Sequence, residues 1–347
     1  MNITVDNDYM IDVLLELLRI PSPTGYTDEA NKYVESKLKE MGIKPERTKK
    51  KALYWQLKSD NPEQRTIASH IDTLGAVVKE IKENGRLKLS MIGGYDWATI
   101  EGAEAIIHLY DGRKITATVV NEKQSTHVFG PELRGMKRTE KIMELRPDAK
   151  TNNEKDTEKL GIEVGNIVSF ESNPKLTQNG YIKARHLDNK AAVAVSLAVS
   201  KALLESEAMP AATTTFFVSN YEEVGHGAAT GIPNETTELL CIDMAAVGEG
   251  QSSKEDKVSL CVKDSSGPYD YEFNQKLRDL AKKNHIDLQN DVYPYYGSDA
   301  SAAWRAGGDF RATLIGPGVD ASHAYERSHK DAIIETAGLV MAYVLSK

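Results

Sequence analysis

The sequence predicts an α/β fold, with a mixed sheet flanked by helices and an inserted small β domain. The 347-residue chain opens with two helical segments followed by two strand-like segments, and after the insert strands alternate with helices, which is typical of a parallel-rich sheet covered on both faces. From about Gly75 to Gly180, short alternating segments replace that pattern, with hairpin signals at Asn84-Gly85 and Asp111-Gly112. We therefore expect one domain over residues 1–74 and 181–347, interrupted by a β domain over residues 75–180.

The flanking segments supply the expected helices and strands. "MIDVLLELLRI" has helical periodicity, and "TDEANKYVESKLKEMG" follows a Thr cap and ends at Gly42; "YWQLKS" and "RTIASHID" have the pattern of strands. After the insert, the pattern predicts a helix in "YIKARHLDNKAAVAVSLAVSKALLES", strands in "TTTFFVSN", "ELLCIDMA" and "RATLIGP", and two later helices, with "YPYYGSDASAAWRAGG" as a loop. Inside the insert, the charged stretch "RGMKRTEKIMELRPDAKTNNEKDTEKLG" predicts a solvated loop and a short helix.

Composition excludes several classes of function. Hydrophobic residues make up 40% and charged residues 27%, and the net charge of -8 gives no general attraction to nucleic acid or to anionic membranes. The N-terminus lacks the pattern of a signal peptide, and no stretch has the length of a transmembrane helix. Cys241 and Cys261 are too few for a disulfide framework and are expected to be packing residues. We expect a cytoplasmic protein with no nucleic-acid or membrane partner.

The segment "NYEEVGHGAA" places two neighbouring carboxylates, Glu222 and Glu223, directly after a hydrophobic strand. Successive side chains of a strand point to opposite faces, so two adjacent Glu residues there need two different roles. The alternative is that one of them is a solvated turn residue, since Glu is mostly found at surfaces.

Other acids and histidines also fall at the ends of expected elements. In open α/β sheets, ligands bind outside the carboxyl ends of the strands, so such residues can converge. Each one alone has a plain structural explanation; Asp188, for example, could simply cap the following helix. Two His and several carboxylates together suit divalent Zn²⁺, Co²⁺ or Mn²⁺. The residues in question are His70, Asp72, Asp188, Glu222, Glu223, Asp243 and His323.

These motifs, in this order, resemble those of a known protein family. "SHIDTLG", "IGGYDW", "HLDNKAA", "EEVG", "GSDA" and "ETAGLV" resemble the tetrahedral-aminopeptidase family of dinuclear metallopeptidases, which includes glutamyl, leucyl and deblocking aminopeptidases, over essentially the whole chain. The resemblance implies a zinc-exopeptidase-like domain, a PDZ-like or barrel-like insert for oligomerisation or substrate access, and short peptides as substrates. It also implies two divalent metal ions, zinc foremost with cobalt or manganese as alternatives, and a homo-oligomer of dimers that build a dodecamer.

The resemblance further implies a role for each residue. His70 and Asp243 would bind one metal, Glu223 and His323 the other, and Asp188 would bridge both; Glu222 would be the general base and acid, and Asp72 would orient the His70 ring. The family usually carries its last ligand in an Arg-aromatic-x-His stretch, whereas this chain has "GVDASHAYERSH" with two histidines. Spacing to Asp299 and Glu335 favours His323 over His329, and Glu326, Arg327 and His329 are then expected to line the substrate side.

Three alternatives stay open from the sequence. A related dinuclear carboxypeptidase or deacylase shares the His-x-Asp and Glu-Glu features, and leaving-group specificity distinguishes it. A glycan hydrolase would use two carboxylates but needs no His pair and no metal. A non-catalytic metal-binding scaffold would bind metal without turnover. The side chain of Arg327 or His329 could favour acidic substrates.

Overall fold

The computed structural model describes residues 3–347, which form two compact units. One unit combines the segment that ends at Asp72 with the segment from Asn173 onward, and the other is Thr73–Ser172. The predicted fold class is confirmed: the first unit is a large mixed sheet flanked by helices, and the inserted unit is a closed β barrel. The sequence-based borders, 75 and 180, lie close to this division.

The sheet of the larger unit contains 13 strands within the described residues. Nine strands follow one another across the sheet, and four more extend it beside β18. In spatial order the nine are β1 (Glu46–Arg47), β2 (Leu53–Leu57), β12 (Thr213–Ser219), β3 (Gln64–His70), β13 (Thr236–Ile242), β18 (Arg311–Asp320), β19 (Glu326–His329), β11 (Tyr181–Ala184) and β10 (Lys175–Leu176). The other four are β14 (Ala245–Val247), β15 (Val258–Asp264), β16 (Gly267–Pro268) and β17 (Gln289–Val292).

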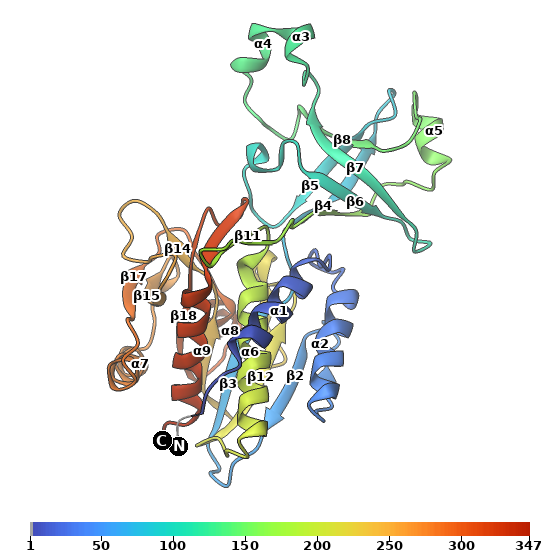
Figure 1. Cartoon of the computed structure of the whole chain (residues 1–347). Helices are drawn as coiled ribbons and strands as arrows, with labels where there is room; N and C mark the ends of the chain where they lie inside the picture. Colours follow the sequence, from blue (N-terminus) through green and yellow to red (C-terminus); the bar gives the residue numbers. More distant parts are fainter. Residues whose placement is uncertain (1–2) are drawn as a thin grey trace. The chain divides into compact units, whose positions relative to one another are not determined.

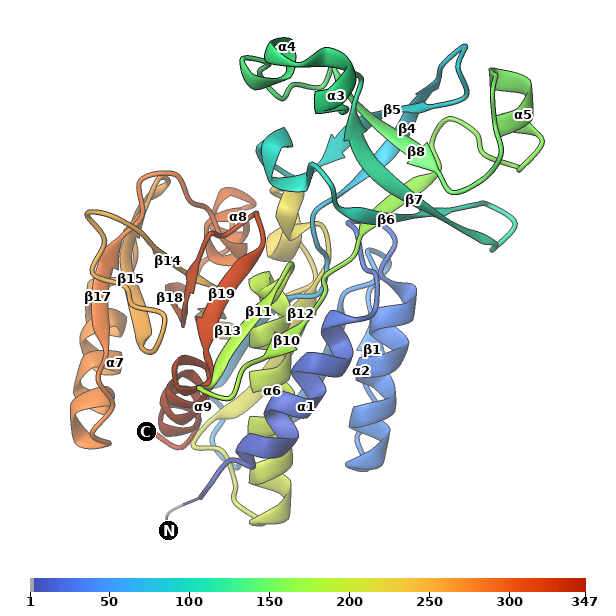
Figure 2. The ribbon, with the colours of Figure 1, turned by 45° about the horizontal axis from the view of Figure 1, so that its top comes forward.

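The centre of this sheet is parallel. β12 pairs with β3, β3 with β13, and β13 with β18, all in parallel, whereas β2, β19 and β11 run antiparallel to their neighbours. Figure 2 follows the antiparallel side of the sheet through β19 and β11 to β10. Because four central strands run in the same direction, their carboxyl ends meet at one edge.

Helices cover this sheet, and α6 lies at the centre of the cover. Nearly every residue from Leu187 to Leu203 is buried, as expected for a helix enclosed on all sides. α6 packs against β3, α1 and α9, and Figure 1 shows these three helices over the sheet. The helices are α1 (Asn7–Leu18), α2 (Asp28–Glu40), α6 (Leu187–Glu205), α7 (Tyr271–Lys283), α8 (Asp299–Arg305) and α9 (Lys330–Val344), with 3₁₀ turns η2 (Glu222–Val224) and η3 (Gly227–Ala229).

The inserted unit is a six-stranded antiparallel barrel with its own apolar core. Both predicted hairpins are present: β4 pairs with β5 across the Asn84-Gly85 turn, and β6 pairs with β7 across the Asp111-Gly112 turn. Around the barrel the strands are β4 (Gly75–Ile81), β5 (Leu87–Ile92), β8 (Met143–Pro147), β7 (Lys114–Asn121), β6 (Glu104–His108) and β9 (Ile167–Phe170). Its short helices are η1 (Trp97–Ile100), α3 (Thr126–Phe129), α4 (Pro131–Arg134) and α5 (Glu154–Glu158).

Two local predictions were wrong, and a third was right only in part. The charged stretch of the insert contains the expected short helix, α5, but it also contains barrel strand β8, whose Met143 and Leu145 belong to the barrel core. The segment Tyr181–Ala184 is a strand beside β19 and not the start of the following helix. Helix α8 lies within the expected loop "YPYYGSDASAAWRAGG", and Ser298 begins it with a capping box.

The structure also bears on the cysteines and on membrane-spanning helices. Cys241 and Cys261 are buried free thiols inside strands, as expected for packing residues. Across residues 3–347, none of the helices combines the length and the apolar character that a membrane span requires.

The barrel buries one carboxylate completely. Glu144 on β8 is 0% exposed, and it is surrounded by three cations: Lys82, Arg86 at 3.0 Å and Lys88 at 3.6 Å. Burial opposes ionisation of this carboxyl, but hydrogen bonds from Lys82 and Arg86 outweigh it and lower the pKa of Glu144. The ion cluster therefore stabilises the folded barrel while Glu144 is ionised.

We expect Glu144→Gln to lower the free energy of unfolding by about 1–3 kcal/mol at pH 7, because three cations lose their buried partner. The cations are partly exposed, which keeps the loss below that of a fully buried pair. A lowered folded-state pKa stabilises the protein above the ordinary value of 4.5, so the difference should shrink as the pH falls below it. Urea unfolding of the full chain at pH 7 and pH 4 measures both effects.

Glu140→Gln is the matched control, since Glu140 also pairs with a lysine of the barrel, Lys79, but both side chains are about half exposed. Its effect should stay within about 0.5 kcal/mol. Equal effects of the two substitutions would contradict a stabilising role for the buried cluster.

Candidate metal centre

The carboxyl-end edge of the central parallel strands gathers the histidines and acids that the sequence analysis singled out. His70 is the last residue of β3, and Asp243 directly follows β13. Asp188 stands at the start of α6, where the backbone is not yet helical and the Asp188-Asn189 peptide bond is cis. Glu222 and Glu223 come after β12, and His323 after β18.

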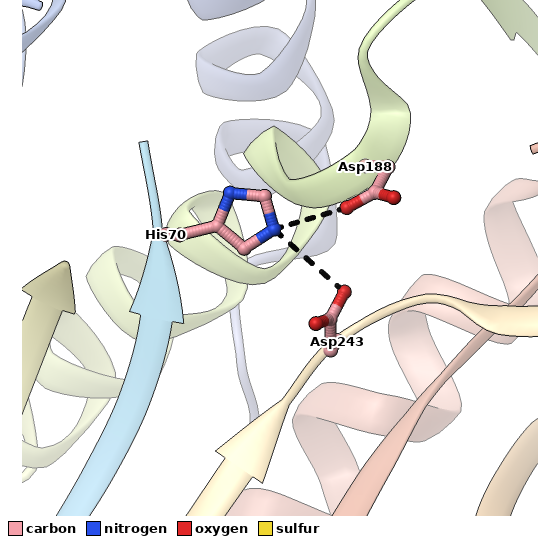
Figure 3. Close-up of side chains that lie close together, drawn as sticks. All are labelled: His70, Asp188 and Asp243. Atoms are coloured by element: carbon pink, nitrogen blue, oxygen red, sulfur yellow. Dashed lines mark hydrogen bonds and ion pairs between the residues drawn. The ribbon is translucent and has the colours of Figure 1, made fainter. Parts of the chain in front are cut away.

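The first group consists of His70, Asp188 and Asp243, all buried. Nε2 of His70 lies 3.1 Å from Oδ1 of Asp188 and 3.9 Å from Oδ1 of Asp243. Figure 3 shows both carboxylates turned toward the same ring nitrogen. The three side chains thus offer one ligand atom each to a common point.

The second group consists of Asp188, Glu223 and His323. Nε2 of His323 lies 3.3 Å from Oδ2 of Asp188 and 3.6 Å from Oε2 of Glu223. The two groups therefore share Asp188, which turns one carboxylate oxygen toward each histidine. A carboxylate in this position would face both cations if each group held one.

The chemistry of these atoms suits cations. Nδ1 of His70 lies 3.0 Å from the backbone oxygen of Asp72, which can only accept, so Nδ1 carries the proton of the neutral ring. While the ring is neutral, Nε2 presents a lone pair toward carboxylate oxygens, and all converging atoms are then acceptors. Oε1 of Glu223 is buried without a hydrogen-bond partner in the described part of the chain. A divalent ion would satisfy both features, and these residues fit such a group.

The charges of the metal-free cluster are strongly coupled. Burial raises the pKa of Glu223 and Asp243, and the nearby Asp188 charge raises both further. Burial disfavours protonation of His70, but the charges of Glu222, Asp188 and Asp243 outweigh it and raise its pKa. Burial also opposes ionisation of Asp188, yet hydrogen bonds with His323 and His70 lower its pKa. Protons thus compensate the excess of carboxylates that bound cations would compensate instead.

Glu222 lies beside the first group without belonging to either one. Its Oε2 is 3.7 Å from Nε2 of His70, and its side chain is 14% exposed. Burial raises the pKa of Glu222 well above its ordinary value, with a smaller contribution from Asp243. The carboxylate also lines a cavity together with ligand residues of both groups.

Asp72 is placed differently from its expected role. It is the backbone oxygen of Asp72 that lies beside Nδ1 of His70, while the nearer carboxylate oxygen is 3.7 Å away. The carboxylate instead accepts the backbone N–H of Glu222 at 3.2 Å and of Glu223 at 3.3 Å, together with the Thr24 hydroxyl at 2.7 Å. Asp72 therefore holds the Glu-Glu segment as well as the His70 ring.

Glu326, which we expected to line the substrate side, is buried behind the ligands. One of its oxygens accepts the backbone N–H of Asp188 and the other that of His323, both at 3.2 Å. Burial raises the pKa of Glu326 to about 8, and the Asp188 charge adds to the effect. No local sequence signal marks this residue, because its role follows only from the approach of β19 to α6.

Arg327 and His329 also lie away from the cavity. Arg327 pairs with Glu255 at 2.7 Å and stacks on the ring of Tyr181. His329 caps helix α9 and lies 2.8 Å from the backbone oxygen of Asn179. The second metal-ligand group contains His323 and not His329.

The cavity at this site has a volume of about 400 Å³, within the range of small-molecule sites. Besides the ligand residues, its lining contains exposed Tyr295 and exposed Arg305, whose side chain makes no hydrogen bond or ion pair within residues 3–347. Sequence reasoning missed Arg305, since it lies on the unexpected helix α8. A larger hollow of about 720 Å³ lies beside β2 and the end of α6, but it contains neither ligand group.

The amino-acid sequence around this site matches a known protein family. The family model of the M42 glutamyl aminopeptidases matches residues 52–339, which include every residue of both ligand groups. The chain belongs to this family. The resemblance inferred from the sequence motifs is thereby confirmed, and the M42 family makes the chain a peptidase of the aminopeptidase type.

Individual relatives agree with the family. The chain is 46% identical over 337 residues to the protein YhfE of Bacillus subtilis (strain 168), with 97% of each chain covered. It is 24% identical to the glutamyl aminopeptidase of Lactococcus lactis subsp. cremoris, over 88% of this chain and 87% of that one. Among solved structures, the TET1 peptidase of Pyrococcus horikoshii has the same fold, with a TM-score of 0.85, 18% identity, and 97% and 100% of the two chains covered.

We expect Glu326→Ala to lower the free energy of unfolding of the metal-free protein by about 2–5 kcal/mol. The substitution leaves two buried N–H groups, of Asp188 and His323, without their acceptor and opens a cavity. Thermal unfolding in EDTA measures the loss. The control is Glu335→Ala, because Glu335 accepts a single backbone N–H and is partly exposed. A Glu326→Ala protein as stable as the control variant would rule out this bracing role.

Proposed function

We propose that the chain is a metal-dependent aminopeptidase that removes N-terminal residues from short peptides. The observation that carries this proposal is the pair of ligand groups that share Asp188, with the carboxylate of Glu222 beside them in one cavity. His70 and Asp243 would hold one divalent ion, Glu223 and His323 the other, and Asp188 would bridge them. Zinc is the first candidate, with cobalt or manganese as alternatives.

Such ions, when bound, supply Lewis acidity that polarises the scissile carbonyl and lowers the pKa of water. Glu222 would take a proton from the attacking water and give it to the leaving amine, which releases the new N-terminus. A carboxyl whose pKa burial has raised is suited to hold that proton between the two steps. Asp72 would keep the base in place through the backbone N–H of Glu222.

We further propose that the chain works as a homo-oligomer. One solved structure with this fold is a dodecamer, and the TET1 peptidase of Pyrococcus horikoshii can assemble into a tetrahedron or a large octahedral shell. The sequence identity of this chain is 19% to the first and 18% to the second. The barrel of Thr73–Ser172 would serve oligomerisation or substrate access, and the mass of the assembly in solution tests the first of these.

Glu222→Gln should lower kcat by about 10²–10⁴-fold on aminoacyl p-nitroanilides while both metals are retained, since the amide cannot accept the proton. EDTA should abolish the wild-type activity, and added Zn²⁺, Co²⁺ or Mn²⁺ should restore it. Metal content by plasma mass spectrometry accompanies each assay. The matched control is Glu235→Gln on an exposed loop, which should behave as wild type.

Other outcomes of this assay assign the chain differently. Cleavage only of acylated or carboxyl-terminal substrates would replace the proposal with a deacylase or carboxypeptidase. Metal binding without any turnover would make the chain a scaffold. Full activity of Glu222→Gln would remove Glu222 from the mechanism.

The substrate preference that we propose depends on Arg305. Arg305 has no acidic partner in the described chain and lines the cavity of the ligand groups, so it could bind an acidic side chain of the substrate. Arg305→Ala should lower kcat/KM for a glutamyl substrate by about tenfold or more and leave an alanyl substrate unaffected. Arg327→Ala is the control, because Arg327 is bound to Glu255. An unchanged ratio of glutamyl to alanyl rates in Arg305→Ala would contradict this preference.

A further inference from the structure

The loop that carries Glu222 has no long element to support it. β12 ends at Ser219, and two 3₁₀ turns follow, with Tyr221 and Gly225 both in the left-handed region. The loop closes on itself, since the backbone oxygen of Tyr221 accepts the N–H groups of His226 and Gly227. A side chain on such a short loop points where the loop's attachments direct it. The position of Glu222 therefore depends on what holds the loop.

One attachment comes from the motif "GSDA", to which the proposed mechanism gives no role. Asp299 is the first residue of α8 and is 3% exposed. One of its oxygens accepts the Ser219 hydroxyl at 2.7 Å, and the other accepts the backbone N–H of Ala228, also at 2.7 Å. A single carboxylate thus joins the last residue of β12 to the far end of the loop, across the turn that contains Glu222.

The close packing at Gly227 places the carboxylate of Asp299 near Glu222. A Cβ atom built on Gly227 would lie 1.8 Å from Oδ1 of Asp299 and 3.2 Å from Cα of Glu222. Both distances are shorter than ordinary carbon contacts, so there is no room for a side chain at Gly227. The carboxylate of Asp299 therefore lies directly against the loop at Gly227, close to the backbone of Glu222.

The loop is also held from another side. Nζ of Lys50 donates to the backbone oxygens of His226 and Gly227, at 2.6 Å each. The loop is thus bound by a cation at its carbonyls and by an anion at its N–H group. Asp72 binds the backbone at the beginning of the loop, and Asp299 binds it at the end, so two carboxylates fix the two ends of the loop.

We propose that Asp299 is a positioning residue for Glu222, which fixes the base by clamping the end of its loop to strand β12. This inference rests on the proposed function, and it gives the "GSDA" motif a role in that reaction. Asp299 does not line the cavity, so it acts through the loop and not on the substrate. A misplacement of about 1 Å in a reacting group can cost about 10²-fold in rate, which sets the size of the expected effect.

The test compares Asp299→Ala and Asp299→Asn at saturating metal. The alanine variant loses both clamping bonds and should lower kcat by about 10–100-fold, with KM within about threefold of wild type and both metals retained. The asparagine variant keeps the shape, since its oxygen can accept from Ala228 and its amide can donate to Ser219. It should stay within about threefold of the wild-type kcat.

A double-mutant cycle with Glu222→Gln identifies the route of the effect. If Asp299 acts through Glu222, adding Asp299→Ala to Glu222→Gln should cause little further loss of kcat. A full additional loss in that background would overturn the inference, and so would a wild-type kcat in Asp299→Ala. Loss of metal from Asp299→Ala would assign the clamp to Glu223 instead and would also overturn it.

A matched control separates clamping from general stability. Asp291 is another buried acid of the same unit, and it accepts the N–H and the hydroxyl of Ser253 away from the cavity. Asp291→Ala should lower stability and leave kcat unchanged. If Asp299→Ala does not fold, Ser219→Ala and Gly227→Ala replace it in the same cycle. Ser219→Ala removes one of the two clamping hydrogen bonds. Gly227→Ala places a Cβ atom too close to Oδ1 of Asp299, so the loop and Asp299 must move apart.

The failure of this inference is distinguishable from the failure of the proposed function. A wild-type protein without aminopeptidase activity, or an active Glu222→Gln variant, would sink the proposed function. An active wild type, an impaired Glu222→Gln and an unaffected Asp299→Ala would sink only the positioning role.

Discussion

The arrangement of the site depends on one carboxylate held between two imidazole rings. Asp188 turns one oxygen to His70 and the other to His323, and the remaining acids approach the same two rings. Such a concentration of buried acceptors repels itself unless protons or cations compensate it. It persists only where the surrounding fold fixes the backbones from which these side chains extend. The parallel centre of the sheet brings those backbones to one edge, and the local contacts then determine their spacing.

A second set of buried carboxylates provides much of that local support, and it does so by binding backbone N–H groups. Asp72 accepts those of Glu222 and Glu223, Glu326 those of Asp188 and His323, and Asp299 that of Ala228. Backbone donors satisfy a buried carboxylate without bringing a countercharge near the cations that the site is proposed to bind. Further Lys or Arg partners at these positions would compete with those cations for the ligand oxygens. Support through the backbone thus keeps the site both rigid and negative.

The sequence was sufficient for the fold class and for the set of residues that meet, because both follow from local patterns. Strand-like segments in alternation with helices predict a parallel centre, and residues at strand ends then share an edge. What the sequence could not supply depends on tertiary contact. Strand β8 has a charged sequence because one face carries exposed Arg146 and buried Glu144, whose cation partners lie elsewhere in the chain, and α8 is too short for its periodicity to stand out. The bracing role of Glu326 arises where β19 meets α6, two segments far apart in the chain.

The adjacent glutamates illustrate how a sound expectation can rest on the wrong local structure. Alternation along a strand predicted two different roles for Glu222 and Glu223, yet β12 ends at Ser219 and both residues lie in the 3₁₀ turn η2. Neighbours in a 3₁₀ helix diverge by about 120°, since three residues complete one turn. Strand geometry would have sent one carboxylate to the opposite face of the sheet. The turn lets both line one cavity, with Glu222 beside His70 and Glu223 beside His323. The proposed base and the proposed ligand can therefore be neighbours in the chain only because the strand stops before them, and this makes the attachments of the loop part of the proposed chemistry.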